Sequence, residues 1–111
     1  MQKQYRLRKN SQFQYVYRKG KGHSTRELSL IYLPSRKKQV GFAVGKKVGI
    51  AVKRNLVKRR LRALFQEELP LIRDGLYIVA ARSGAAEADY QTLRRSLKYL
   101  LRKQQLYRTQ V

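Results

Sequence analysis

Residues 45–68, GKKVGIAVKRNLVKRRLRALFQEE, predict the longest helix of the chain, over residues 50–69. Pro70 follows this stretch, and a residue that precedes proline disfavours the helical region, so the helix should end there. The apolar residues recur at three- and four-residue spacing and share one stripe of a helical wheel. This predicted buried stripe consists of Ile50, Val57, Leu61, Leu64 and Phe65.

The polar arc of the same helix contains cations and no acid. Arg54, Lys58 and Arg62 repeat every four residues, and Asn55 and Arg59 lie beside them. Each like-charged pair at this spacing costs an isolated helix about 0.2–0.5 kcal/mol. A solvated basic face on a core helix is the ordinary interpretation of such an arc. The alternative is that phosphate groups supply the missing negative charge.

The charge of the whole chain favours the second interpretation. Lys and Arg number 27 and Asp and Glu number 6 among 111 residues, which gives a net charge of +21. No acid occurs in residues 1–26 or 28–66. The hydrophobic fraction of 42% is typical of a folded domain rather than of a basic disordered tail. We therefore expect a folded protein that binds a polyanion, and RNA in particular.

Composition also limits chemistry and location. The chain has no cysteine, which excludes disulfides and thiolate metal sites. No apolar run approaches the length of a membrane span, and the first residues lack the apolar segment of a signal peptide. A basic organellar transit peptide is the alternative interpretation of this N-terminus. The expected location is the cytoplasm.

The remaining segments predict one α+β domain. A helix over residues 11–19 is expected to be capped by Ser11 with Gln14. Asp89 is expected to cap a last helix over 90–104, whose buried stripe is Leu93, Leu97, Leu100 and Leu101. Strands are predicted over 27–33, 39–45 and 75–82, and more weakly over 23–25. The first two should form a hairpin, and the third should be central. The domain should span 1–111, with frayed ends at about 1–8 and 107–111.

The central segment resembles a known family signature. KKVGIAVKRNLVKRRLR, residues 46–62, is similar to the arginine- and asparagine-containing motif of the bacterial ribonuclease P protein component. LRKNSQFQYVYRKG (7–20) resembles the opening helix of that family, and GLYIVAAR (75–82) resembles its late strand. The likeness covers nearly the whole chain. Leu56 stands where the family often has arginine.

The resemblance implies a fold and a role. The fold is a two-layer sandwich in the order α-β-β-β-α-β-α, with a small central sheet and an uncommon left-handed crossover, as also occurs in a ribosomal protein domain. The protein would bind the catalytic RNA of ribonuclease P and the 5′ leader of precursor tRNA. The RNA would perform the endonucleolytic cleavage with Mg²⁺ that it and the substrate mainly hold. The chain would then be part of an enzyme without catalytic residues of its own.

The resemblance also implies two sets of contact residues. In the family, a cleft between the first helix and the sheet takes the single-stranded leader, and Phe13 and Tyr17 match its aromatic positions. Ile31 stands where the family has a third aromatic residue of this cleft. The contacts to the catalytic RNA would be Lys46, Lys47, Lys53, Arg54, Asn55, Lys58, Arg59 and Arg62. The contacts to the precursor-tRNA leader would be Phe13, Tyr17, Ile31, Lys9 and Arg8.

Other interpretations stay open from sequence. The spacing of Phe13, Val16 and Tyr17 alone favours core packing. A structural RNA-binding protein, such as a ribosomal protein, shares the charge and is the main alternative function. A nuclease acting alone needs clustered carboxylates or a histidine with partners, and His23 stands alone in an expected loop. A basic membrane-surface helix fits poorly with apolar residues spread over sheet and helices. No obligatory protein partner is evident.

Overall fold

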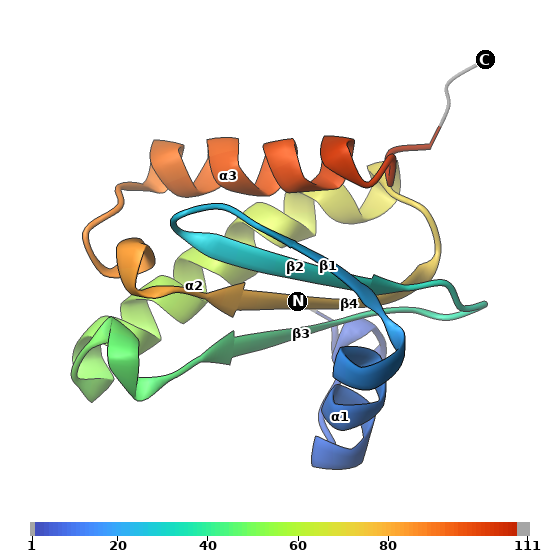
Figure 1. Ribbon diagram of the computed structural model, residues 1–111, viewed down its shortest axis with the longest axis horizontal. Coiled ribbons are helices and arrows are strands. Elements are labelled where there is room, and N and C mark those ends of the chain that lie inside the picture. Colours follow the sequence, from blue (N-terminus) through green and yellow to red (C-terminus); the bar gives the residue numbers. More distant parts are fainter. Residues whose placement is uncertain (1, 109–111) are drawn as a thin grey trace.

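The computed structural model describes residues 2–108, which form a four-stranded sheet with helices on both faces (Figure 1). This arrangement confirms the α+β class and the predicted order of elements. The helices are α1 (Asn10–Lys19), α2 (Ala51–Glu68) and α3 (Tyr90–Lys103). The strands are β1 (Lys21–Ser24), β2 (Leu28–Leu33), β3 (Lys38–Val44) and β4 (Gly75–Ala81).

The strand order is β1-β2-β4-β3, with β2 antiparallel to β1 and β4, and β3 parallel to β4. The predicted hairpin of β2 with β3 is therefore wrong, because β4 lies between them. Tyr77, Ile78 and Val79 of β4 are fully buried, so both faces of this strand are covered. A strand that is apolar on both faces gains most from two neighbours. The turn signal at Pro34 indicates only that the chain leaves β2 there.

The connection between the parallel strands gives the fold its uncommon hand. β3 and β4 point the same way, and α2 passes behind them before the chain returns (Figure 1). This left-handed crossover agrees with the family expectation and is rare among parallel strand pairs, of which about 98% are right-handed. It places the predicted cationic arc beside β3, at the edge of the sheet.

Two clusters of apolar side chains hold the layers together. The larger lies between the sheet and the helices α2 and α3, and includes Val57, Leu61, Leu64 and Phe65 as predicted. Ile50 does not belong to it: the residue precedes the first turn of α2 and is 76% exposed. α2 begins beyond the end of β3 (Figure 1), so nothing packs over Ile50.

The smaller cluster lies under α1, on the opposite face of the sheet. It consists of Leu7, Val16 and Ile78, with four partly buried residues around it: Phe13, Ile31, Leu33 and Leu76. Core packing at Val16 is thus confirmed. His23 lies in strand β1 rather than in a loop.

The helix starts are only partly as predicted. α1 begins at Asn10, and the Oε1 of Gln12 accepts the backbone N–H groups of Arg8 and Lys9 at 3.3 and 3.2 Å. The predicted cap by Ser11 is wrong because Gln12, three residues after Lys9, reaches back to these free donors. The cap of α3 is confirmed: the Thr92 N–H donates to Asp89 Oδ1 at 2.7 Å. The predicted stripe of four leucines on α3 is buried.

Chain segments near both ends, within the ranges predicted to fray, make contacts with the rest of the fold. The Leu7 N–H donates to the Val40 carbonyl at 2.9 Å, and the Leu7 side chain is 6% exposed. The Arg108 N–H donates to the Leu71 carbonyl at 2.9 Å. Each segment is held by a strand or turn distant in sequence, which local sequence signals do not reveal. Met1 and residues 109–111 lie outside the described residues. No helix within residues 2–108 is long and apolar enough to cross a membrane.

Candidate nucleic-acid interface

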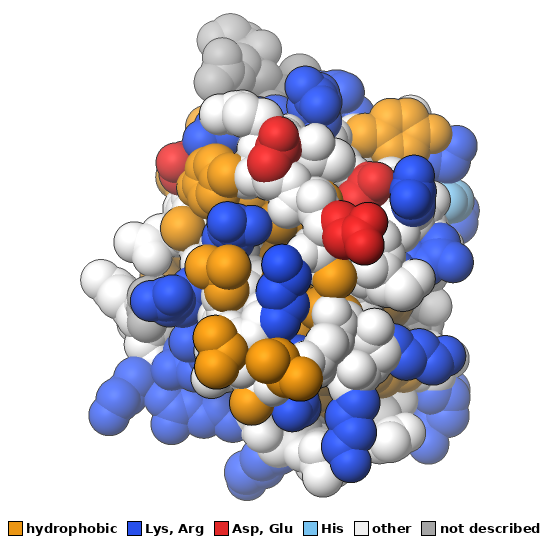
Figure 2. Space-filling view, turned by 90° about the vertical axis from the view of Figure 1, so that its left-hand side faces the viewer, with side chains coloured by type: hydrophobic (Ala, Val, Ile, Leu, Met, Phe, Trp, Pro, Cys, Tyr) orange, Lys and Arg blue, Asp and Glu red, His pale blue; other side chains and the backbone are white. Residues whose placement is uncertain are grey.

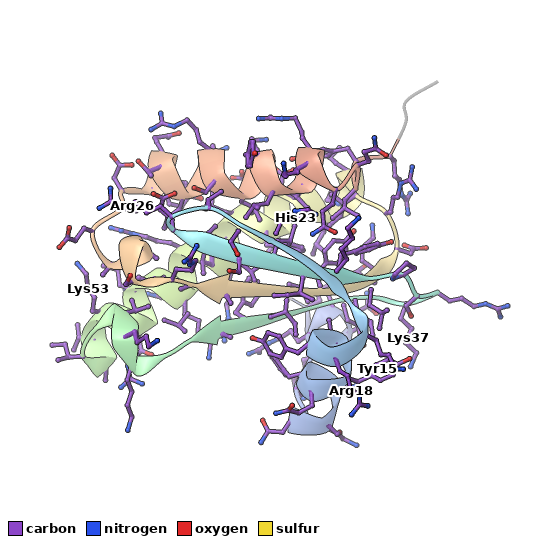
Figure 3. The ribbon with its side chains drawn as sticks, in the orientation of Figure 1. Tyr15, Arg18, His23, Arg26, Lys37 and Lys53 are labelled. Carbon is purple, nitrogen blue, oxygen red and sulfur yellow. The ribbon has the colours of Figure 1, made fainter. Side chains whose placement is uncertain are left out.

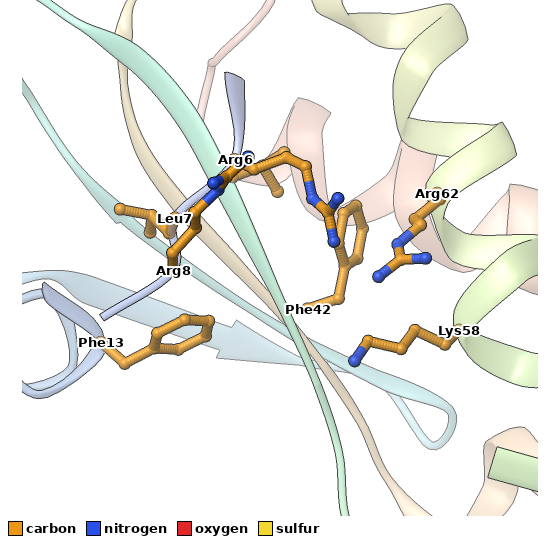
Figure 4. A pocket seen from close by; sticks show the side chains of 8 residues that line it. Arg6, Leu7, Arg8, Phe13, Phe42, Lys58 and Arg62 are labelled. Atoms are coloured by element: carbon orange, nitrogen blue, oxygen red, sulfur yellow. The ribbon is translucent and has the colours of Figure 1, made fainter. Parts of the chain in front are cut away.

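A cleft of about 420 Å³ opens between the N-terminal segment, the edge strand β3 and helix α2 (Figure 4). Apolar and aromatic side chains line part of it, and four cations line the rest. In Figure 4 the cations of α2 reach toward the strand from one side, and Arg6 reaches in from the other. The lining residues are Arg6, Leu7, Arg8, Phe13, Val40, Phe42, Lys58 and Arg62.

The apolar lining is fixed by the cores beneath it. Val40 and Phe42 are two residues apart on β3 and therefore share a face. The Phe42 ring meets the Phe65 ring of α2 edge to face, with centroids 6.1 Å apart. Phe13 packs in the small cluster and also lines the cleft, so its ring is shared between the core and the cleft.

The cationic arc of α2 has no internal counter-charge. Arg54, Lys58 and Arg62 are half-buried, and within residues 2–108 no carboxylate forms an ion pair with them. The Nε atoms of Arg54 and Arg62 are buried without a hydrogen-bond acceptor. A buried donor left unsatisfied costs about 1–3 kcal/mol. An anionic oxygen bound at this arc would supply the missing acceptor and the missing charge.

Arg60, on the same helix, differs from the arginines of the arc because its guanidinium has a hydrogen-bond acceptor within the protein. The guanidinium of Arg60 donates to the Ala88 carbonyl at 3.4 Å, and so ties α2 to the loop before α3. The ion pairs among the described residues use other cations: Lys38, Arg94, Lys98 and Arg108. The acids that form these ion pairs, Glu67, Glu68 and Asp74, therefore neutralise none of the cations of the arc.

The remaining predicted contacts to the catalytic RNA extend the basic surface around the start of α2. Lys46 and Lys47 lie exposed in the turn Lys46–Val48, and Lys53 lies exposed in the first turn of the helix. Asn55 and Arg59 are exposed on α2. Figure 2 views the end where α2 begins: acidic side chains appear only in the upper half, and the lower half shows cations and apolar groups.

The predicted leader contacts divide between two places. Arg8 and Phe13 line the cleft, whereas Lys9, Tyr17 and Ile31 do not. Ile31 packs in the small cluster under α1, on the same face as Phe13. Tyr32 points to the other face, where its ring lies 4.9 Å from that of Tyr77. Tyr17 is 45% exposed, and partial burial raises the pKa of its hydroxyl.

The site predicted from the sequence lacked four of the residues that line the cleft: Arg6, Leu7, Val40 and Phe42. Arg6 belonged to the end that was expected to fray, but its pairing with Val40 fixes it beside β3. Phe42 was expected in a hairpin strand, but β3 is an edge strand, so one side of the strand stays open. The alternation of Val40, Phe42 and Val44 was the available signal for the face, and nothing local indicated the edge.

These features define a small, basic α+β domain with a left-handed crossover and a cleft lined by rings and unpaired cations. The family model described as ribonuclease P matches residues 1–105. The chain is 39% identical to the ribonuclease P protein component of Bacillus velezensis, over 97% of this chain and 96% of the relative. It is 36% identical to that of Streptococcus agalactiae, over 92% and 95%.

Solved structures of ribonuclease P proteins have the same fold as this chain. The RNase P protein of Staphylococcus aureus superposes with a TM-score of 0.87 at 30% identity, over 94% of this chain and 98% of that one. The RNase P protein of Thermotoga maritima superposes with a TM-score of 0.79 at 26% identity, over 88% and 96%. The chain belongs to the ribonuclease P protein family.

Proposed function

We propose that this chain binds the catalytic RNA of ribonuclease P and the 5′ leader of precursor tRNA, and thereby aids removal of the leader. The observation that carries the proposal is the set of half-buried arginines on α2 that have no internal acceptor or counter-charge. A solvated basic face would keep these Nε atoms in water. Family membership makes the catalytic RNA the natural source of the anions.

The cleft suits a single strand that lies next to such an RNA. Unpaired bases stack on aromatic rings, and cations along the groove bind the phosphates between them. Phe13 and Phe42 provide the rings. The cations lie on both sides of the cleft: Arg6 and Arg8 on the N-terminal segment, and Lys58 and Arg62 on α2. We propose that the leader lies in this groove, with Tyr17 and Lys9 extending the contact along α1.

We propose that the Mg²⁺ of the reaction is held by the RNA and the substrate. The cleft does not fit a divalent cation, because Mg²⁺ prefers carboxylate, phosphate and water oxygens and the charged groups that line this cleft are cations. The contribution of the protein is then to bind and orient phosphates, which lowers the repulsion between two RNA molecules. We propose that this occurs in the cytoplasm.

Reconstitution tests the proposal. The full chain is added to the cognate catalytic RNA at low Mg²⁺, with precursor tRNA as substrate, and cleavage is compared with the RNA alone. We expect faster cleavage at the 5′ end and no cleavage by the protein without the RNA. Unchanged cleavage with protein present would contradict the proposed role. Cleavage by the protein alone would contradict the assignment of catalysis to RNA. Co-sedimentation with ribosomal subunits instead would favour a ribosomal role.

A further inference from the structure

The outer face of α3 has a second set of unpaired cations, far from the cleft in the fold. The helix, YQTLRRSLKYLLRK, contains five cations and no acid. Two of the five are neutralised by the last turn of α2: Arg94 donates to Glu67 at 3.1 Å, and Lys98 donates to Glu68 at 2.8 Å. Within residues 2–108 the other three, Arg95, Arg102 and Lys103, have no ion pair.

These three cations share one face of α3 with an exposed aromatic ring. Arg95, Tyr99, Arg102 and Lys103 follow i, i+4, i+7, i+8 spacing and therefore share the face opposite the buried leucines. The Tyr99 side chain is 46% exposed, and Lys103 Nζ lies 5.9 Å from the ring centroid. The ridge from Arg95 to Lys103 is about 12 Å long at about 1.5 Å per residue. A single exposed tyrosine is ordinary, but a tyrosine flanked by cations on both sides is the arrangement that stacks bases.

The ridge is rigid. Leu97, Leu100 and Leu101 are fully or almost fully buried beneath it. Gln104 Nε2 at its end donates to the carbonyls of Lys21 and Leu30 at 3.2 and 3.1 Å. A ligand that binds here therefore meets a helix backbone that is already ordered, although the exposed cations still lose side-chain freedom on binding.

Strand β1 extends the same surface. Lys21 and His23 lie opposite Tyr32 and Leu30 in the sheet, and opposite partners in an antiparallel pair point to the same face. Tyr32 and Leu30 face the large core, so Lys21 and His23 lie on the α3 side of the edge strand. Figure 3 shows His23 below α3.

The ridge and the cleft are separate surfaces. α2 packs over β3 and α3 packs over β2, on the same face of the sheet but over strands that β4 separates. The two ion pairs of Arg94 and Lys98 lie between the helices. The unpaired cations of the cleft and those of the ridge therefore do not form one continuous surface along which a single RNA strand would run.

We propose that the outer face of α3 is a second RNA-binding surface, on which Tyr99 stacks an unpaired base while Arg95, Arg102 and Lys103 bind the flanking phosphates. This inference goes beyond the proposed function, because the ridge would bind unpaired RNA whether or not the cleft binds a leader. The partner is an RNA strand rather than an acidic protein, since a guanidinium–tyrosine–ammonium row offers both a stacking surface and phosphate contacts.

The test uses the full chain and a fluorescent, unstructured oligouridylate of about 12 nucleotides, within the site sizes known for single strands. Binding is measured by anisotropy at several salt concentrations, and the contact is located by chemical-shift changes of backbone amides. We expect shifts over residues 95–103. We expect Tyr99→Ala to weaken binding about 5-fold or more and Tyr99→Phe to retain it. We expect Arg95→Ala to lower the salt dependence by about 0.7 in the log–log slope.

Arg94→Ala is the matched control, because it removes the same charge one residue away from a cation already paired with Glu67. Its affinity should stay close to that of the unaltered chain. Equal losses in Arg94→Ala and Arg95→Ala would show that only net charge matters and would overturn the proposal. Shifts confined to α1, β3 and α2 would overturn it as well. Failure of the proposed function appears separately, as unchanged precursor-tRNA cleavage on reconstitution.

Discussion

The ring of Phe13 occupies the space that a side chain at position 41 would fill. A Cβ on Gly41 would lie 2.3 Å from the Cζ of Phe13 and 2.6 Å from its Cε1. Heavy atoms of a real structure do not approach so closely, so glycine at this point of β3 is what lets the ring lie against the strand. Phe13 is thereby held between the small core and the cleft.

Gly41→Ala should therefore displace Phe13. We expect a stability loss of about 1–3 kcal/mol from overpacking, measured by urea unfolding. We also expect weaker binding of leader-bearing precursor tRNA, to about the level of Phe13→Ala, with little change for leaderless tRNA. The double variant should cost less than the sum of the two single variants, because alanine at position 13 vacates the space. Additive losses, or equal losses with leaderless tRNA, would contradict this positioning.

Tyr17 and Tyr15 form a matched pair on α1. Their side chains are 45% and 46% exposed, but only Tyr17 lies one turn from Phe13 on the same face. Tyr17→Ala should weaken the binding of leader-bearing substrate by about 5-fold or more, the usual cost of one lost stacking partner. Tyr15→Ala should leave it nearly unchanged. The measurement is the affinity of the reconstituted particle for substrates with and without a leader.

Arg62 and Arg60 offer a second matched pair, on α2. Arg62 lines the cleft with an unsatisfied Nε, whereas Arg60 donates to the Ala88 carbonyl. Arg62→Ala should lower the slope of log affinity for the catalytic RNA against log salt by about 0.9, one phosphate contact in a duplex-like region. Arg54→Ala should behave in the same way. Arg60→Ala should change the slope little but lower the stability. The same slope in all three variants would argue against phosphate contacts at this arc.

Glu68 is a buried carboxylate that joins three segments. It accepts from Lys98 Nζ at 2.8 Å and from the Tyr107 hydroxyl at 2.7 Å, and it is 3% exposed. Glu68→Ala leaves both donors without this acceptor, so we expect a loss of about 1–3 kcal/mol in the free energy of unfolding. Glu67→Ala removes an exposed pair with Arg94 and should cost less than about 1 kcal/mol. Similar losses in the two variants would show that Glu68 has no special structural role.

The sequence sufficed where the deciding interactions were local. The stripe of α2 apart from Ile50, the four leucines of α3 and the Asp89 cap all follow from spacing within one element, and the structure confirms each of these. Prediction from the sequence failed where contacts between segments distant in the chain determine the structure. The place of β4 between β2 and β3, and the pairing of Leu7 with Val40, depend on contacts far apart in the chain. The motif located the cations of the site, but the cleft also needs Arg6 and Phe42, which only the edge position of β3 brings together.

The cap of α3 predicts an acid-dependent contribution to stability. The Thr92 N–H that donates to Asp89 lowers the pKa of this carboxyl below its ordinary value. The unfolded chain then binds this proton more readily than the folded chain does. The cap is therefore fully stabilising above the ordinary pKa of about 4, and its contribution is lost as pH falls through the lower folded pKa.

Asp89→Asn separates this titration from capping, because asparagine also caps helices but does not ionise. We expect the melting temperature of the unaltered chain to fall more steeply between pH 5 and pH 2 (about the window in which a stabilised aspartate titrates) than that of Asp89→Asn. Glu87→Gln, which alters an exposed acid two residues away, should retain the steeper fall. If all three chains showed parallel melting curves against pH, the Thr92 hydrogen bond would not be what makes this carboxylate stabilising.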